Sequence, residues 1–365
     1  MNSKERYARQ TILPEVGEAG QERLARARVL VVGAGALGTP ALYYLAAAGV
    51  GSIGIADDDV LELSNLHRQI LYRSGDIGRS KADAATERLV EFNPDIHAEA
   101  HRLRVTADNA VALFRGYDIV LDATDRLATK FLINDACAKA ERPLVHAAIL
   151  GFEARVAVFD ARRGPCLRCL FPAPPDTPTL TCAEAGVIGA VPGMAGSLQA
   201  LEAIKWVLAA GARTAALQGL LGRLWLMDGR RLETRVVELP RDPVCPICRH
   251  DPVDIALPRE APPVRQVAPD ELDHYGDALL LDVREEEEWN AGHLEGAVHC
   301  PLSHLMEGAP QLPERERYIA YCAHGIRSET AARLLGEAGY RNVFSLAGGI
   351  AAVRGDAGKP ARTPE

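Results

Sequence analysis

The chain has 365 residues, and its content of 48% hydrophobic and 25% charged residues excludes an intrinsically disordered protein. Its length predicts two or three domains, and we expect two. The formal net charge of −8 argues against nucleic acid as a partner, and the acidity is concentrated in residues 256–365, with 11 Lys and Arg against 18 Asp and Glu. Within that part, the run Glu285 to Glu288 is interpreted as a solvated surface.

Residues 29–56 carry no charge, but glycines and Pro40 interrupt them, so two short apolar segments are predicted rather than a membrane span. The N-terminal sequence MNSKERYARQ lacks the apolar core of a signal peptide. We therefore expect a cytoplasmic protein with no membrane partner. In that compartment the eight cysteines are expected to serve metal binding or thiol chemistry rather than disulfides.

The first predicted elements form a βαβ unit. RVLVVGAGALG predicts a strand over about 29–32 that runs into a glycine turn, TPALYYLAAAG predicts a helix that Gly49 ends, and SIGIADDD predicts the next strand. Gly33, Gly35 and Gly38 form the pattern G-x-G-x-x-G between strand and helix. Backbone amides and the helix dipole can receive phosphates at such a turn.

The later apolar runs DIVLDAT and PLVHAAI predict buried parallel strands, which makes the fold a doubly wound α/β sheet over residues 1–255. Prolines in 171–180 suggest an exposed crossover or flap, and those in 256–269 suggest an interdomain linker. Three further strands and the helical SETAARLLGEAG predict a second, smaller α/β domain over 270–355, followed by a flexible tail, 356–365.

The residues after the glycine turn indicate which nucleotide binds there. Asp57 ends the second strand and is placed to bond a ribose hydroxyl, which equally suits a dinucleotide dehydrogenase. Asn65, Arg68 and Lys81 then follow, and together they can converge on a polyphosphate. There is no G-x-x-x-x-G-K-[ST], so an ATP site here is of another design. Asp125, after a predicted strand, is either a Mg²⁺ ligand or a helix cap.

Two C-x-x-C pairs, Cys166 with Cys169 and Cys245 with Cys248, lie 76 residues apart. Thiolates two residues apart can share one tetrahedral ion, and two such pairs fill a structural Zn²⁺ site. Redox-active dithiols are the alternative.

The loop CAHGIR opens with Cys322 and closes with Arg327. Three alternatives are open for Cys322: the nucleophile of a phosphatase, a residue that carries sulfur, or a buried thiol at the start of a helix. A cysteine phosphatase needs five residues between cysteine and arginine, and the position this requires is occupied by Ser328. The loop is one residue short, so we expect no phosphatase activity and a site that encloses a sulfur atom.

Several motifs together resemble the MoeB/ThiF adenylyltransferases, relatives of ubiquitin-activating enzymes, over about residues 5–250: RYARQ, GAGALG, LSNLHRQ, LDATD, PCLRC, TCAEAGV, GSLQALEAIK and CPIC. The resemblance implies a Rossmann-like sheet of that type with structural zinc. It also implies that a small ubiquitin-like sulfur carrier, of the MoaD or ThiS type, presents its C-terminal Gly-Gly carboxylate to the α-phosphate of ATP. The products are an acyl-adenylate and pyrophosphate.

By motif position, the resemblance implies that Asp57 holds the ribose, that Asn65, Arg68 and Lys81 hold the phosphates, and that Asp125 holds Mg²⁺. Arg9 would reach a neighbouring subunit, which implies a homodimer. Ala36 and Arg126 depart from residues common in the family. The implied nucleotide-binding set is Gly33, Gly35, Ala36, Gly38, Asp57, Asp59, Ser64, Asn65, Leu66, His67, Arg68, Lys81, Asp125, Arg126 and Arg9.

Cys182, in LTCAEAG, stands where relatives use a cysteine to capture the carrier or to release a thiocarboxylate, and a merely inherited thiol is the alternative. Residues 264–355 resemble a single rhodanese-like domain, through LLDVREEEEWNAGHLEGAVHCPL, YCAHGIRS and LAGGI. In that family the thiolate corresponding to Cys322 carries a persulfide, and Arg327 with the helix N-terminus would stabilise it. Ala323 stands where a basic residue is frequent, which leaves open whether thiosulfate is the donor.

The resulting hypothesis is a two-step enzyme in which the first domain adenylylates the carrier and the Cys322 persulfide converts the adenylate to a thiocarboxylate. The persulfide would come from a cysteine desulfurase or from thiosulfate. The alternatives are an NAD-dependent oxidoreductase with an appended sulfurtransferase and a binding protein that uses no ATP. The pathway stays open among molybdopterin, thiamine, tRNA thiolation, cysteine and siderophore synthesis.

Overall fold

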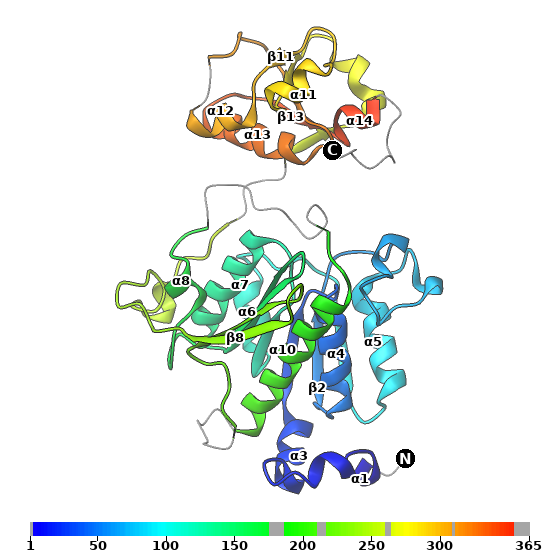
Figure 1. Cartoon of the computed structure of the whole chain (residues 1–365), viewed down its shortest axis with the longest axis vertical. Helices are drawn as coiled ribbons and strands as arrows, with labels where there is room; N and C mark the ends of the chain where they lie inside the picture. Colours follow the sequence, from blue (N-terminus) through cyan, green and yellow to red (C-terminus); the bar gives the residue numbers. More distant parts are fainter. Residues whose placement is uncertain (1–2, 175–185, 210–216, 260–263, 309–310, 354–365) are drawn as a thin grey trace. The chain divides into compact units, whose positions relative to one another are not determined.

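The computed structural model describes residues 3–174, 186–209, 217–259, 264–308 and 311–353. The chain divides into two compact units, Met1–Arg259 and Glu260–Glu365, each with its own sheet (Figure 1). Cys182 and most of the proline-rich segment 171–180 lie outside the described residues. Among the described residues no helix is both long enough and apolar enough to cross a membrane.

The sheet of the first unit has eight strands in the order β3-β2-β1-β4-β5-β6-β7-β8. The pairs from β3 to β5 are parallel and those from β5 to β8 are antiparallel. The predicted parallel, doubly wound sheet is confirmed, whereas the antiparallel extension was not predicted. The strands are β1 Arg28–Val32, β2 Ser52–Ala56, β3 His97–His101, β4 Ile119–Asp122, β5 Leu144–Leu150, β6 Glu153–Phe159, β7 Arg223–Asp228 and β8 Glu233–Glu238.

Helices cover both faces of this sheet and enclose two apolar cores. One core gathers the apolar faces of α3 (Gly17–Arg26), α4 (Gly38–Ala47), α5 (Lys81–Phe92) and α10 (Ala190–Leu208). The other is formed with α6 (Ala110–Arg115) and α7 (Leu127–Ala140). The N-terminal segment carries α1 (Ser3–Arg6) and α2 (Ala8–Thr11), and α8 (Leu167–Leu170) follows β6. This layering leaves the carboxyl ends of the parallel strands as the place for a ligand.

The turn between β1 and α4 requires glycine at two positions for different reasons. Gly33 has φ +94°, in the left-handed region. Gly38 has no such φ, but a Cβ there would lie 2.0 Å from the carbonyl oxygen of Gly33. Gly35 is different again, because the nearest atom to its added Cβ would be 4.0 Å away, on Gln69. Gly38 therefore serves close packing of helix against turn, and Gly35 keeps the space above the turn open.

Gly38→Ala is expected to lower the free energy of unfolding by more than about 3 kcal/mol, because backbone cannot yield as a flexible side chain can. Gly35→Ala is the matched control and is expected to change stability by less than about 1 kcal/mol. Chemical denaturation of the two variants measures the difference. Equal stability of the two variants would show that the turn relaxes without cost.

The second unit contains a five-stranded parallel sheet in the order β11-β10-β12-β13-β9. The strands are β9 Arg265–Val267, β10 Leu279–Asp282, β11 Val298–His299, β12 Tyr318–Tyr321 and β13 Val343–Leu346. The α-helices are α11 Glu286–Asn290, α12 Leu302–Glu307, α13 Ile326–Glu337 and α14 Gly349–Val353. Short 3-10 turns lie at Leu63–Asn65, Ser74–Asp76, Pro252–Asp254 and Pro269–Tyr275.

β9 lies inside the segment predicted as the linker, 256–269, and it pairs with β13. The second folded unit therefore begins before residue 270, and this boundary was wrong. The nearby prolines favoured a linker over a strand at this position. In addition, an edge strand of three residues is too short to show the alternation of apolar and polar residues that identifies a strand.

Candidate functional site

A cavity of about 560 Å³ opens where β1, β2 and β4 end. Its lining comes from the glycine turn, the segment after β2, the start of α5 and the segment after β4. The structure thus brings together most of the residues predicted to bind a nucleotide: Gly33, Gly35, Ala36, Asp57, Asp59, Asn65, Arg68, Lys81, Asp125 and Arg126.

Asp57 is held rigidly at the edge of this cavity. Its Oδ2 accepts a hydrogen bond of 2.7 Å from the backbone N–H of Ala34, and its Oδ1 accepts one of 2.9 Å from the N–H of Asp59. Burial raises the pKa of Asp57, and the two backbone donors and Lys81 oppose that rise only in part. The carboxylate is fixed in orientation and remains an acceptor for a ligand hydroxyl.

Two cations and an amide from separate segments border the same cavity. Lys81 is 6% exposed, and its Nζ lies 2.8 Å from Oδ2 of the exposed Asp59. The guanidinium of the half-buried Arg68 donates to the carbonyl oxygen of Ser64 at 2.7 Å. Asn65 is buried, and its Oδ1 accepts from the N–H of Glu62 at 3.2 Å. The cavity therefore carries positive charge on its wall from Lys81 and Arg68.

Some predicted residues do not line the cavity of the single chain. Gly38 supports the turn from behind, and Leu66 packs against the apolar core. Ser64 and His67 are exposed and contact Arg68, the latter with Nε2 at 2.9 Å from its Nη1. Arg9 is exposed on α2. Their predicted part in binding stays a prediction.

A network of buried charged side chains lies next to the cavity, and it was not predicted from the sequence. Asp122, at the end of β4, is fully buried and accepts from Lys130 Nζ at 3.1 Å, His146 Nδ1 at 2.8 Å and Thr124 Oγ1 at 2.7 Å. Burial alone would raise the pKa of Asp122, but Lys130, His146 and Thr124 together hold it well below its usual range. Burial lowers the pKa of His146, which is neutral at pH 7.

Lys130 belongs both to this network and to the cavity wall. Its Nζ also donates to the carbonyl oxygen of Ala147 at 2.6 Å, and Gln199 Nε2 donates to the carbonyl oxygen of Asp122 at 2.8 Å. Gln69, another wall residue, is 4% exposed, and its Oε1 has no partner among the described residues. Lys130 was not predicted because a lone lysine inside a helical pattern carries no motif, and Gln69, although it ends the motif LSNLHRQ, was given no role.

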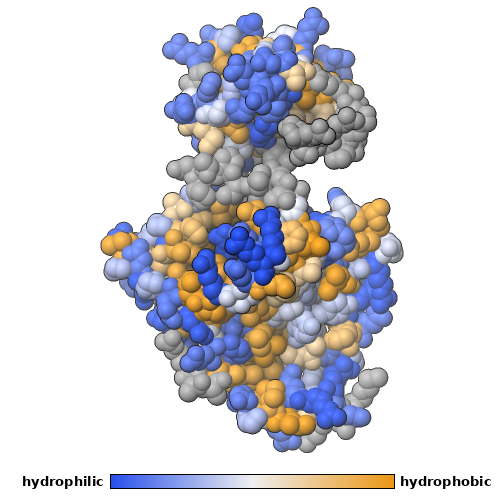
Figure 2. Space-filling model, in the orientation of Figure 1, coloured by the Kyte–Doolittle hydropathy of each residue, from blue (hydrophilic) through white to orange (hydrophobic). Residues whose placement is uncertain are grey.

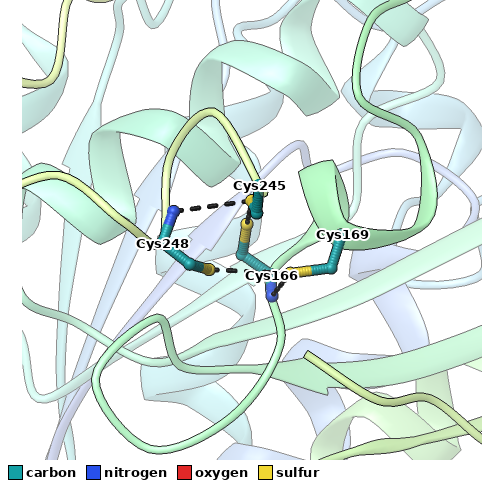
Figure 3. Close-up of side chains that lie close together, drawn as sticks. All are labelled: Cys166, Cys169, Cys245 and Cys248. Atoms are coloured by element: carbon teal, nitrogen blue, oxygen red, sulfur yellow. Dashed lines mark hydrogen bonds between the residues drawn. The ribbon is translucent and has the colours of Figure 1, made fainter. Parts of the chain in front are cut away.

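The four predicted metal ligands come together in one cluster (Figure 3). Cys166 directly precedes α8 and Cys169 lies within it, and their sulfurs lie 3.6 Å from Cys245 Sγ and 3.7 Å from Cys248 Sγ, respectively. A tetrahedral ion with bonds of about 2.3 Å holds its ligand sulfurs about 3.8 Å apart. All four sulfurs lie within 4.8 Å of one another, so this cluster could hold a metal such as zinc.

The electrostatics of the cluster also favour a cation. A hydrogen bond from Cys248 lowers the pKa of Cys166 to about 6, whereas burial raises that of Cys245 to about 11. Contact with the Cys166 sulfur raises the pKa of Cys248 far above its usual value. In the absence of a cation, the negative charge of one thiolate thus keeps the neighbouring thiols protonated. A divalent ion offsets this negative charge and allows all four cysteines to be thiolates.

In the second unit, Cys322 lies at the bottom of a loop between β12 and α13. It is 2% exposed, and its Sγ accepts from the N–H of Gly325 at 3.1 Å and lies 3.8 Å from Ser328 Oγ. Gly349 packs against this loop so closely that an added Cβ would lie 2.3 Å from the carbonyl oxygen of Cys322. The thiol is therefore enclosed by backbone, at the N-terminus of a 12-residue helix that favours a negative charge.

Arg327 does not stand alone above this loop. Its two terminal nitrogens each lie 2.6 Å from a carboxylate oxygen of Glu288, on α11. Glu288 holds the pKa of Arg327 above its usual value, and Arg327 lowers that of Glu288. The interpretation of the acidic run as a purely solvated surface was wrong for Glu288, because the topology places α11 beside the start of α13.

Comparisons with known proteins find a family for each of the two units. The model of the ThiF family matches residues 7–247, and that of the rhodanese-like domain matches residues 268–356. The Mycobacterium tuberculosis protein named "Probable adenylyltransferase/sulfurtransferase MoeZ" is 40% identical over 368 residues, covering 95% of this chain and 92% of that protein.

Two further relatives cover different shares of the chain. The Thermus thermophilus "Sulfur carrier protein adenylyltransferase" is 47% identical over 259 residues, 69% of this chain and 93% of that protein. The Anopheles gambiae "Adenylyltransferase and sulfurtransferase MOCS3" is 41% identical over 327 residues, 82% of this chain and 73% of that protein.

The crystal structure of E. coli MccB with ATP aligns with a TM-score of 0.58 at 21% identity, over 67% of this chain and 75% of that one, which shows the fold of the first unit. The chain thus belongs to the ThiF family, carries a rhodanese-like domain after its ThiF domain, and is an enzyme of the adenylyltransferase and sulfurtransferase class.

Proposed function

We propose that this enzyme adenylylates the C-terminal Gly-Gly carboxylate of a small ubiquitin-like sulfur carrier and then converts it to a thiocarboxylate with sulfur from Cys322. A carboxylate oxygen of the carrier attacks the α-phosphorus of ATP, the bond to the β-phosphate breaks, and pyrophosphate leaves. The persulfide sulfur of Cys322 then attacks the acyl carbon, and AMP leaves. The observation that carries this proposal is that a cation-lined nucleotide cavity and an enclosed thiol occur on one chain.

In this proposal each cavity residue has a stated task. Asp57 accepts from a ribose hydroxyl, since both its oxygens are oriented by backbone donors. Arg68, Lys81 and Asn65 bind the phosphates and stabilise the charge that develops at phosphorus. Lys81 would exchange its contact with Asp59 for a phosphate oxygen. Asp125 would hold Mg²⁺, which neutralises phosphate charge when bound.

Two further features act outside the first attack: the four-cysteine cluster and Cys182. The proposed metal of the Cys166, Cys169, Cys245 and Cys248 cluster is structural zinc, because four thiolates complete a tetrahedral site and leave no open position. Release of the product needs a second thiol to attack Cys322 at its sulfur, which frees the thiocarboxylate and leaves a disulfide that a cellular thiol reduces. Cys182 is the proposed thiol, and its position lies outside the described residues.

A homodimer is part of the proposal, with Arg9 entering the neighbouring subunit's nucleotide site. Ile12 is 70% exposed near Arg9, and Leu63 and Ile70, on either side of Arg68, are 71% and 61% exposed. Figure 2 shows further hydrophobic surface over α10, which carries the exposed Met194 and Leu201. Exposed apolar side chains around both ends of the proposed contact fit an isologous interface. The cytoplasmic location stays a prediction.

ATP–pyrophosphate exchange in the presence of a Gly-Gly carrier tests the first step. Exchange is expected with the wild-type chain, and Arg68→Ala is expected to reduce it at least about 100-fold, since one charge-stabilising contact contributes roughly 3 kcal/mol to a transition state. Arg73→Ala is the control, since Arg73 is an exposed arginine of the same segment that does not line the cavity. No exchange with any Gly-Gly carrier of the source organism would refute the proposal.

ATP affinity is expected to fall in acid through Asp57. Its pKa is raised by burial, so protonation begins above the usual Asp range of about 4 and removes an acceptor for the ribose hydroxyl. Titration of binding between about pH 7 and pH 4 should show this loss, and Asp57→Asn should bind weakly with little dependence on pH. A wild-type affinity that is constant over this range would contradict the role of Asp57.

A further inference from the structure

Two described arginines near the sulfur-carrying loop, Arg327 within it and Arg284 over the ring of Tyr321 just before it, are each paired with a carboxylate. Arg327 makes the bidentate contact with Glu288 at 2.6 Å on both sides. Arg284, 6% exposed, is bound by Asp282 at 2.6 Å and by the carbonyl oxygen of Gly292 at 2.8 Å. In the loop itself, Ala323 carries no charge at a position where a basic residue is frequent in the rhodanese-like family, and His324 is exposed. The loop thus presents little net positive charge to an incoming donor.

The pairing of Arg327 has a chemical consequence because sulfur donors differ in charge. Thiosulfate is a dianion: the Cys322 thiolate attacks its outer sulfur, the S–S bond breaks, and sulfite dianion leaves with the electron pair. A persulfide R–S–SH reacts at its outer sulfur in the same way, and the thiolate R–S⁻ leaves. Both reactions give Cys322 one additional sulfur, but only the first requires a dianion to approach the thiolate.

We propose that Glu288 selects the sulfur donor by charge: by pairing with Arg327 it disfavours the thiosulfate dianion relative to donors of lower charge, of which a persulfide is the fitting class. Glu288 is half-buried, with 37% of its side chain exposed, and its partner is 35% exposed, so water screens the pair only partly. Glu288 is a positioning residue, since it acts through Arg327. This inference rests on the proposed sulfur transfer at Cys322 and is independent of adenylylation.

The test uses two donors that deliver sulfur through the same atom and differ by one charge, thiosulfate and the monoanion methanethiosulfonate. The measured quantity is the ratio of their kcat/KM values for transfer of sulfur to cyanide by the full chain. Glu288→Gln keeps the size and one acceptor for Arg327 but removes the charge. We expect it to raise the thiosulfate-to-methanethiosulfonate ratio about ten-fold, as one unit charge at a partly screened distance allows.

Two controls separate charge from structure. Glu288→Asp retains the carboxylate and is expected to keep the wild-type ratio, and Glu287→Gln makes the same change at an exposed neighbour and is also expected to keep it. Glu288→Ser provides a second charge-removing variant. A purely structural role would change both donors alike and leave the ratio unmoved, and that result would overturn the inference. Failure of both donors to load Cys322 in the wild-type chain would instead count against the proposed sulfur transfer.

Discussion

Replacement of Lys130 by methionine is expected to lower the free energy of unfolding by about 3–5 kcal/mol, because it leaves the carboxylate of Asp122 buried without its cation. Asp122 is fully buried, and Lys130 is 5% exposed with Nζ at 3.1 Å from Oδ2. Methionine fills nearly the same volume, so lost packing contributes little to the expected change. The network also helps to fix the shape of the cavity. Lys130 joins the end of β4 to β5, because its ammonium contacts Asp122 on β4 and donates to the carbonyl oxygen of Ala147 on β5.

Chemical denaturation of Lys130→Met and Lys139→Met measures this effect on one helix. Lys139 donates to the carbonyl oxygens of Val253 and Ile255 and has no carboxylate partner among the described residues, so its loss is expected to cost about 1 kcal/mol. Equal costs for the two variants would contradict the account.

The pH dependence of the free energy of unfolding provides a second test of the pairing between Lys130 and Asp122. The pKa of Asp122 is lowered on folding, so its stabilising contribution is present above the unfolded value of about 4 and is lost as pH falls through the folded value. The difference between wild type and Lys130→Met should therefore shrink in acid.

Removal of the proposed metal from the cysteine cluster is expected to lower the stability of the first unit by more than about 4 kcal/mol. The cluster joins α8 to the segment 245–248, which is distant in the sequence, and Cys245 is fully buried. Without the ion, buried thiols and one thiolate are left with only each other as partners.

Calorimetry of the full chain with and without a strong chelator checks this, together with the metal content of the untreated protein. Cys245→Ser should resemble the chelated wild type and should not respond further to the chelator. The transition of the unit that contains Cys322 serves as the internal control and should stay in place. A metal-free wild type of undiminished stability would show that the four cysteines do not form a metal site.

The sequence predicts the parts of this molecule where pattern and local chemistry coincide. The glycine turn, the strand ending at Asp57 and the two C-x-x-C pairs each carry a spacing that only a few structures satisfy, and the structure brings their residues together. Strands β1, β2, β4 and β5 are buried apolar runs, which periodicity detects. The antiparallel strand β8 is exposed along its whole length, so it lacks the alternation that would have indicated it.

The residues that were missed depend on tertiary contacts. Lys130 in a helical pattern resembles an ordinary surface lysine, and only the placement of α7 over the end of β4 brings its ammonium to Asp122. Glu288 is one of four consecutive glutamates, and nothing local distinguishes it from Glu287. The pairing with Arg327 arises because β10 and β12 are neighbours in the sheet, which brings α11 to the start of α13. No sequence spacing encodes such a neighbour.

The central claim is that one chain first activates a carboxylate and then sulfurates it, and the mass of the carrier after a single turnover tests it most directly. With ATP and a persulfide donor, the wild-type chain is predicted to yield the carrier thiocarboxylate. Cys322→Ala is predicted to stop at the carrier adenylate, with pyrophosphate released at the wild-type rate. Thiocarboxylate formed by Cys322→Ala as fast as by the wild type would contradict the account.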